Sequence, residues 1–310
     1  MILQSEVRPH VCVLMSTYNG EQFLAEQLDS LLAQQGVDVT IVIRDDGSSD
    51  GTRKLLELYE SRNRNIEVHL GSNLGVVLSF FDLMRIASTS AADFFALCDQ
   101  DDVWLPEKLS KAVRALGPSQ SIPRLYCSAV RYVDRSLRHI SVSRTRLRPG
   151  FGNAVVENIA TGCTTVFNKA LLQRVNSAPP TGALMHDWWL YMVATAFGEV
   201  VFDPESWILY RQHGRNVIGG TTSMTKMLMI RLRRLTVRQD GIFKCSDQAR
   251  EFLDCFGGRC PPAHREVLQE MLAVRGDFFE RLRFAFTGKV RRNHWVDDGI
   301  LRLLLIAGRY

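Results

Sequence analysis

The sequence of 310 residues predicts an α/β fold in which helices flank a mainly parallel central sheet, with a helical extension at the C-terminus. Two observations support this fold class. Short apolar runs alternate with amphipathic segments through the first 116 residues, and the turns between them are short. Beyond about residue 220 the alternation stops and basic helical patterns follow. We therefore expect one domain over residues 1–220 and a basic helical region over residues 221–310.

The first half of the chain repeats one strand–helix unit. Residues 11–15 are all apolar and predict a buried strand, and residues 21–35 place apolar side chains on one face of a helix. The β-branched run at 39–43 predicts the next strand. The same patterns give helices over residues 51–62, 76–87 and 106–116 and strands over residues 66–69 and 94–97.

The second half is less regular. Residues 120–167 read as β-rich segments and loops, residues 187–196 as a helix, and residues 199–202 and 207–210 as two strands. The longest apolar candidate for a membrane span, residues 300–307, is short and interrupted by Arg302, so we expect no transmembrane helix.

The composition is that of a soluble globular protein, with 46% apolar and 23% charged residues. Seven cysteines, an odd number scattered along the chain, do not form the pattern of a secreted disulfide framework. The N-terminus also lacks the basic and apolar regions of a signal peptide, so a reducing cytoplasm is expected. Cys255, Cys260 and His264 lack a second ligand pair at zinc-finger spacing.

The acidic run Asp99-Gln100-Asp101-Asp102 directly follows the apolar strand at 94–97. Three adjacent carboxylates repel one another, which favours a cation among them. The carboxyl edge of an α/β sheet is also where ligands bind. Oxygen ligands favour Mg²⁺ or Mn²⁺, and these cations often bridge a carboxylate to substrate phosphates. The alternative is an acidic turn before a helix N-terminus, where negative charge is favourable.

Other polar turns follow the neighbouring strands, at residues 16–19, 45–51 and 73–75. In a parallel sheet they converge on one edge, where carboxylates can bind a nucleobase, a ribose and a cation on a diphosphate. Helix capping explains Ser48, Asp50 and Gly51, but not the adjacent pair Asp45-Asp46. No P-loop or Rossmann glycine motif follows any predicted strand.

Residues 11–20, 43–52 and 96–109 resemble the inverting family 2 glycosyltransferases, which have the GT-A fold. The sequence of residues 99–109 is similar to a motif of the rhamnosyltransferase branch, whose members build O-antigen and other bacterial surface polysaccharides. Residues 161–168, 186–189 and 210–214 match further motifs of that branch. The resemblance spans residues 10–220 and implies a nucleotide-binding half over about 1–116 and an acceptor half over about 117–220.

The resemblance also implies roles for individual residues. Asp46 is expected at the base, Asp99 at the ribose, Asp101 on Mg²⁺ or Mn²⁺, and Asp187 as catalytic base. His213 lies near the diphosphate and is expected as a second metal ligand, while Asp102 supports the cluster or caps the next helix. The remaining expected nucleotide-sugar contacts are Thr17, Tyr18, Asn19, Asn73, Gln100 and Arg211. One departure from the family is Leu-Ser-Phe-Phe at residues 78–81.

The chemistry of glycosyl transfer agrees with these residue types. The departing diphosphate needs charge neutralisation, and the acceptor hydroxyl needs a base. The apolar neighbours of Asp187 favour a raised pKa. Trp188 and Trp189 are expected to bind the acceptor sugar. The alternatives are a helix cap for Asp187, an ordinary loop histidine for His213 and core packing for the tryptophans.

The charge of the chain is unevenly distributed, because residues 221–310 carry 17 basic and 10 acidic side chains. Residues 223–239 predict a basic amphipathic helix, which suits an anionic membrane surface. The alternative is a helix packed on the main domain with a solvated basic face. No aromatic stacking platform accompanies the basic residues, so nucleic acid is not an expected partner.

We therefore expect a cytoplasmic enzyme, peripheral on the inner face of the bacterial membrane. It would transfer a sugar, rhamnose from dTDP-rhamnose, to a lipid-linked or polysaccharide acceptor. A sugar-nucleotidyltransferase shares the layout, but its Gly-rich signature is missing at residues 16–20. A non-catalytic scaffold of a polysaccharide assembly complex is the other alternative.

Overall fold

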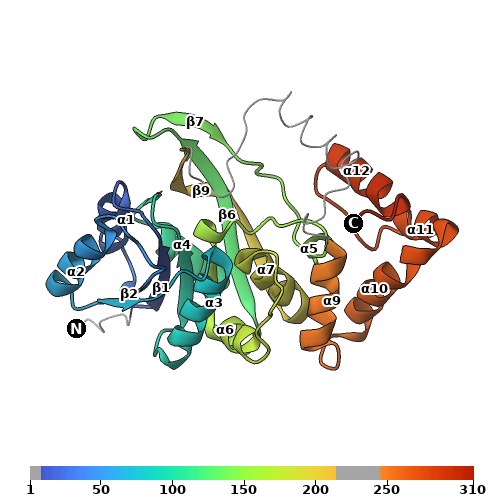
Figure 1. The fold of residues 1–310 in the computed structure, drawn as a ribbon, viewed down its shortest axis with the longest axis horizontal. Coiled ribbons are helices and arrows are strands. Elements are labelled where there is room, and N and C mark those ends of the chain that lie inside the picture. The colour runs from blue at the N-terminus through green and yellow to red at the C-terminus, as the bar shows by residue number, and fades with distance from the viewer. Residues whose placement is uncertain (1–7, 214–244) are drawn as a thin grey trace, which may run out of the picture.

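The computed structural model describes residues 8–213 and 245–310 of the chain (Figure 1). In these ranges the strands form one sheet in the order β3-β2-β1-β4-β8-β6-β9-β5, and β7 pairs with β6 outside this path. The strands are β1 His10–Thr17, β2 Asp38–Asp45, β3 Ile66–Leu70, β4 Phe94–Cys98, β5 Val103–Trp104, β6 Arg124–Val133, β7 His139–Val142, β8 Val166–Asn168 and β9 Glu199–Arg211.

Helices cover both faces of the sheet (Figure 1). They are α1 Leu24–Leu32, α2 Thr52–Arg62, α3 Val76–Ile86, α4 Lys108–Leu116, α5 Phe151–Ala154, α6 Lys169–Asn176, α7 His186–Phe197, α9 Cys245–Phe256, α10 Pro262–Ala273, α11 Phe278–Ala285 and α12 Trp295–Ile306. Alternate residues of β1 enter two separate hydrophobic clusters. Leu14 packs with α3 residues on one face, and Val13 with α1 and α4 residues on the other.

The first half of the sheet is parallel, as the alternating pattern predicts. β1 pairs in parallel with both β2 and β4, in a register that puts Thr17 opposite Asp45 and Met15 opposite Cys98. The strands consequently end together, and the polar turns that follow them meet at one edge of the sheet. The α/β architecture and the helical C-terminal extension expected from the sequence are both present.

One strand prediction in the second half is wrong. Residues 199–202 and 207–210 belong to a single strand, β9, which runs parallel to β6. The register shifts where Ser128 pairs with Asp203 and the next residue, Ala129, pairs with Ser206. The two extra residues of β9 at this shift include Pro204, which cannot donate a ladder hydrogen bond.

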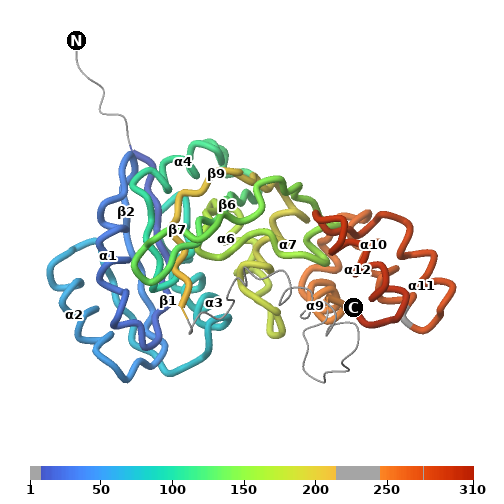
Figure 2. The backbone as a smooth tube through the Cα atoms, turned by 90° about the horizontal axis from the view of Figure 1, so that it is seen from above, coloured from blue at the N-terminus to red at the C-terminus, as the bar shows by residue number. Residues whose placement is uncertain are grey.

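The C-terminal helices pack against the acceptor half of the sheet domain. The rings of Phe252 and Phe256 in α9 lie 5.6 and 6.2 Å from the Trp189 ring of α7. Figure 2 shows α10, α11 and α12 at the end of the molecule opposite α1 and α2. The expected boundary at residue 220 and the basic segment 223–239 lie outside the described residues. Across the ranges that the structure describes, no helix is long and apolar enough to cross a bilayer.

We expect Gly152→Ala to destabilise the fold, because a Cβ at Gly152 would lie 2.0 Å from the Lys289 carbonyl oxygen. The new methyl group must displace the segment that brings Arg291 to donate to the Gly152 carbonyl at 3.3 Å. The expected loss is about 1–3 kcal/mol in the free energy of unfolding, measured by denaturant titration. Gly150→Ala is the matched control, because a Cβ there meets no atom within 4 Å. Equal unfolding free energies in the two variants would contradict the packing of residues 289–291 on α5.

Candidate functional site

The turn after β2 is built around two buried carboxylates, Asp45 and Asp46. Asp45 accepts hydrogen bonds from the Ser48 backbone N–H at 3.0 Å and the Arg53 Nε at 2.9 Å. Asp46 forms an ion pair with Arg44 and accepts from the backbone N–H groups of Leu74 and Gly75 at 2.8 and 2.9 Å. The loop that carries Asn73 is therefore held directly against this turn.

Two hydrogen bonds of Gln100 connect the loop after β1 to the acidic run. The Gln100 Oε1 accepts from the Tyr18 backbone N–H at 2.8 Å, and its Nε2 donates to the Tyr18 carbonyl at 3.0 Å. A Cβ at Gly20 would lie 2.2 Å from the Gln100 Oε1, so only glycine leaves room for this contact. The Gln100 side chain is thus a structural contact between two loops, while the Tyr18 ring stays half exposed.

Thr17 and Asn19 fix the same loop on the β2 side. Thr17 is buried and its hydroxyl donates to the Asp45 carboxylate at 3.2 Å. Asn19 has a positive φ of 49° and its Oδ1 accepts from the Ser49 backbone N–H at 2.8 Å. The two loops therefore form one rigid rim, from which the Tyr18 ring and Asn73 remain exposed.

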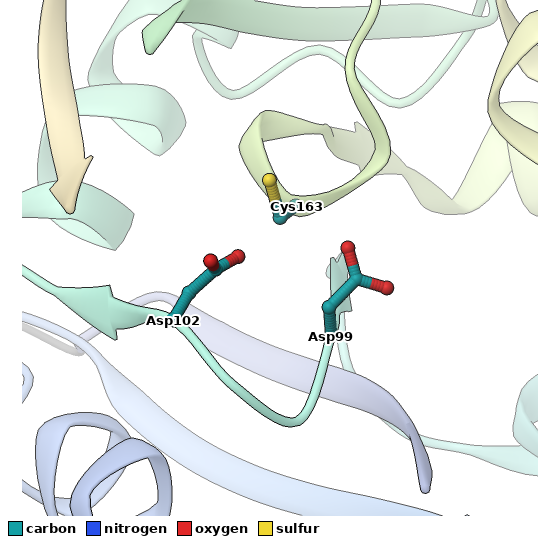
Figure 3. Close-up of side chains that lie close together, drawn as sticks. All are labelled: Asp99, Asp102 and Cys163. Atoms are coloured by element: carbon teal, nitrogen blue, oxygen red, sulfur yellow. The ribbon is translucent and has the colours of Figure 1, made fainter. Parts of the chain in front are cut away.

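Asp99, Asp102 and Cys163 form a compact cluster (Figure 3). One ligand atom from each, a carboxylate oxygen or the sulfur, lies within 4.8 Å of the other two. Burial and the charges of Asp101 and Asp187 raise the pKa of Asp99 to about 7. Burial and the charges of Asp101 and Asp99 raise the pKa of Asp102 well above its usual range. Placing these carboxylate charges close together costs free energy, and a bound cation would reduce that cost.

The donor set of the cluster fits a hard divalent cation. Asp102 Oδ2 is buried and has no hydrogen-bond partner among the described residues. Burial raises the pKa of the Cys163 thiol well above its ordinary value, so the thiol stays protonated and is a poor ligand beside carboxylates. Lys108 is the nearby buried ammonium group, 3.2 Å above the Trp104 ring centroid, and burial lowers its pKa to about 8.

The strand β9 closes the site from the far half of the chain. His213 Nε2 lies 2.7 Å from Asp101 Oδ2, so the two expected metal ligands are in direct contact. Arg211 is fully buried and donates from Nε to the Asp101 carbonyl at 2.9 Å, and its guanidinium also pairs with Glu26. The Arg211 side chain therefore fixes the position of the acidic turn.

Asp102 does not cap the following helix. Its Oδ1 accepts from the Arg211 backbone N–H at 3.1 Å, whereas α4 begins at Lys108 after the cap residue Glu107. The helix-capping role expected for Asp102 is wrong, because its buried carboxylate bonds to β9 instead.

Asp187 lies in the first turn of α7 and is buried against the segment before β8. Its Oδ2 accepts from the Gly162 backbone N–H at 2.9 Å, and its Oδ1 accepts from the Trp188 backbone N–H at 2.6 Å. Burial raises its pKa to about 6, an effect that these backbone hydrogen bonds and the Asn158 side chain partly offset. Since the charge of Asp187 also raises the Asp99 pKa, this carboxylate and the acidic cluster share one site.

Trp189 is not at this site. Its side chain is fully buried in the hydrophobic core against α9, so it has no surface for a sugar ring. Trp188 is partly buried and its indole N–H donates to the Ala154 carbonyl at 2.6 Å. The structure therefore gives Trp189 the core-packing role, and the acceptor contact expected of it is wrong.

Proteins of known family are similar to this chain in sequence and in fold. The family model described as glycosyl transferase family 2 matches residues 12–176, more than half of the chain. The chain belongs to glycosyl transferase family 2. Similar family members include the dTDP-rhamnosyl transferase RfbG of Shigella flexneri, 30% identical over 221 residues, which are 67% of this chain and 75% of RfbG. The putative teichuronic acid biosynthesis glycosyltransferase TuaG of Bacillus subtilis is 31% identical over 105 residues, 34% of this chain and 40% of TuaG.

Solved structures have a similar fold. S. aureus TarS 1-349 in complex with UDP matches with a TM-score of 0.55 at 18% identity, covering 90% of this chain and 75% of that chain. The mannosyltransferase PcManGT from Pyrobaculum calidifontis, in complex with GDP-Man and Mn²⁺, has a TM-score of 0.50 at 17% identity and covers 90% and 73%. At these identities the matches establish the GT-A fold of this family 2 chain.

His186 is a site residue that the family motif did not assign. It is buried, its ring stacks on Phe80 at 4.0 Å, and neither ring nitrogen has a partner among the described residues. A Cβ at Gly162 would lie 3.2 Å from its Nε2, so the ring lies beside the Asp187 contact. Burial lowers its pKa to about 3, which keeps the imidazole neutral. The sequence signal was only its place before Asp187, because burial on Phe80 depends on α3.

Proposed function

We propose that this family 2 glycosyltransferase transfers a sugar from a nucleoside-diphosphate sugar to an acceptor hydroxyl with inversion at the anomeric carbon. The observation that carries the proposal is Asp187, a buried carboxylate with a pKa of about 6 that acts electrostatically on the acidic cluster. Asp187 also contacts Gly162, the residue before Cys163 of the acidic cluster, and a base beside a phosphate-binding site is what a single displacement requires.

In the proposed reaction the Asp187 carboxylate accepts the proton of the acceptor hydroxyl. The freed oxygen lone pair forms the bond to the anomeric carbon as the bond to the diphosphate oxygen breaks, so the configuration inverts. Asp101 and His213 would hold Mg²⁺ or Mn²⁺, which supplies charge neutralisation on the leaving diphosphate when bound, and Asp99 would bind the ribose. The rim residues Tyr18 and Asn73, with Thr17, Asn19 and Asp46, surround the space proposed for the nucleoside.

For the donor we propose dTDP-rhamnose, and for the pathway a bacterial surface polysaccharide. The similarity to the dTDP-rhamnosyl transferase of Shigella flexneri supports the donor, and that to the teichuronic acid glycosyltransferase of Bacillus subtilis supports the pathway. The proposed acceptor is a lipid-linked or polysaccharide glycan. An intact acid cluster and base favour an enzyme over a non-catalytic scaffold.

We also propose peripheral binding to an anionic membrane surface through α11 and α12. Large apolar side chains are exposed there, with Phe279 75%, Phe286 67% and Trp295 81% accessible. Residues 278–310 carry seven basic and three acidic side chains. Exposed aromatic rings beside basic side chains suit the headgroup region of an anionic bilayer.

Asp187→Asn is expected to lower transfer by about 10²–10⁴-fold, because the amide cannot accept the acceptor proton. Wild-type kcat should rise as the pH rises through about 6, where Asp187 loses its proton, whereas His186 stays neutral in this range. Turnover of a panel of nucleotide-sugars, including dTDP-rhamnose, measures both. Asp134→Asn, at the surface turn after β6, is the control. A wild-type rate in Asp187→Asn would show that another group is the base.

Phe279→Ser combined with Trp295→Ser is expected to reduce binding to phosphatidylglycerol vesicles at least tenfold in a sedimentation assay. The reason is that the two substitutions remove aromatic rings from the exposed surface of α11 and α12, and with them apolar area that can enter the bilayer. Leu70→Ser, which removes an exposed apolar side chain from β3, is the matched control. Binding to neutral phosphatidylcholine vesicles should be weaker than to anionic ones. Undiminished binding of the double variant would place the membrane contact elsewhere.

A further inference from the structure

A cavity of about 600 Å³ opens between the β6–β7 hairpin and the segment 157–161. Tyr132 and Ser141, which pair across the hairpin, line it together with Asn158, Thr161 and Gln212. Its volume is in the range of small-molecule sites. Most of the lining residues lie outside the motif segments, but Thr161 and Gln212 belong to the segments 161–168 and 210–214.

Three lining residues of the cavity lie close in sequence to residues of the candidate site or to their contacts. On one side, Asn158 lines the cavity, and its side chain lowers the pKa of Asp187, opposing the effect of burial. Thr161, another lining residue, precedes the Gly162 N–H that donates to Asp187. On the other side, Gln212 precedes His213, which contacts Asp101. The cavity therefore borders the segments that contact the proposed base and the proposed metal ligands.

The charged groups in the lining already have partners. Arg144 pairs with Asp297 of α12 at 2.8 Å. Glu157 accepts from the Asn153 side chain at 2.6 Å and from the Asn293 backbone N–H at 2.8 Å. A charged ligand would compete with these contacts. The lining thus favours an uncharged ligand.

The other lining groups suit a sugar ring. Gln212 Nε2 is buried and has no hydrogen-bond partner within the described ranges, so it is a donor available to a ligand hydroxyl. The hydroxyl groups of Ser141 and Thr161 add polar contacts, while Tyr132 and Ile140 add apolar surface. Polar groups around apolar side chains match the two kinds of surface of a pyranose.

We propose that this cavity binds an uncharged sugar residue of the acceptor glycan. The inference rests on the proposed transferase function and deepens it, because it assigns acceptor recognition to the β6–β7 hairpin and Gln212 in place of the buried Trp189. The contacts of Arg144 and Glu157 also fix the rim of the cavity to residues 293–297, so the C-terminal helices support acceptor binding.

Saturation-transfer NMR with methyl α-L-rhamnoside and methyl β-N-acetylglucosaminide tests this assignment, with methyl β-glucuronoside as the charged probe. We expect the wild type to bind at least one neutral glycoside more tightly than the glucuronoside. Ser141→Tyr, which fills the cavity, and Gln212→Ala, which removes the donor, should each weaken that binding about tenfold. His139→Tyr is the matched control, because His139 is exposed on the same strand and does not line the cavity.

The affinity of the same proteins for dTDP separates two kinds of failure. Unchanged dTDP affinity in Ser141→Tyr with lost glycoside binding supports the inference and shows that the variant is folded. Three results would overturn the inference while dTDP still binds, and the proposed function would then stand. They are no glycoside binding in the wild type, equal glycoside binding in Ser141→Tyr and the wild type, and a preference for the glucuronoside. Failure of the wild-type protein to bind dTDP would instead contradict the proposed function.

Discussion

The crowding of three carboxylates at the end of β4, where Asp102 is fully buried and Asp99 and Asp101 are half-buried, is the constraint on which the rest of the site depends. Asp99 and Asp102 approach each other beside Cys163, and Asp101 lies between them in the sequence. Burial and mutual repulsion raise the pKa values of Asp99 and Asp102, so the fold holds them at a cost in free energy. A binding site for a cation and a diphosphate accounts for acids kept in such a place.

The surrounding structure holds this cluster rigidly from three sides. Gln100 ties the acidic turn to the loop after β1, and Arg211 holds the Asp101 carbonyl from β9. Lys108 supplies a buried positive charge from α4. The contacts of Gln100 and Arg211 join residues more than 70 positions apart, which makes the position of the acids a property of the whole sheet.

The sequence was sufficient for the parallel half of the fold, because its strands and helices have clear periodicity and short turns. It was insufficient for β9, where a bulge at Pro204 interrupts the pattern, and for α6, which the sequence pattern did not predict. Among the site residues, Asp187 and the acidic run could be found from local motifs. The burial of Trp189 could not, because it depends on α9, which is 56 or more residues away in the chain.

The central claim is that the acidic cluster binds a diphosphate through a divalent cation. Calorimetric titration of the wild-type protein with dTDP, in MnCl₂ and then in EDTA, tests it most directly. The account predicts that Mn²⁺ tightens dTDP binding at least tenfold and that Asp101→Asn, which removes one carboxylate charge, loses this enhancement. Equal dTDP affinity in Mn²⁺ and in EDTA for the wild type would contradict the account.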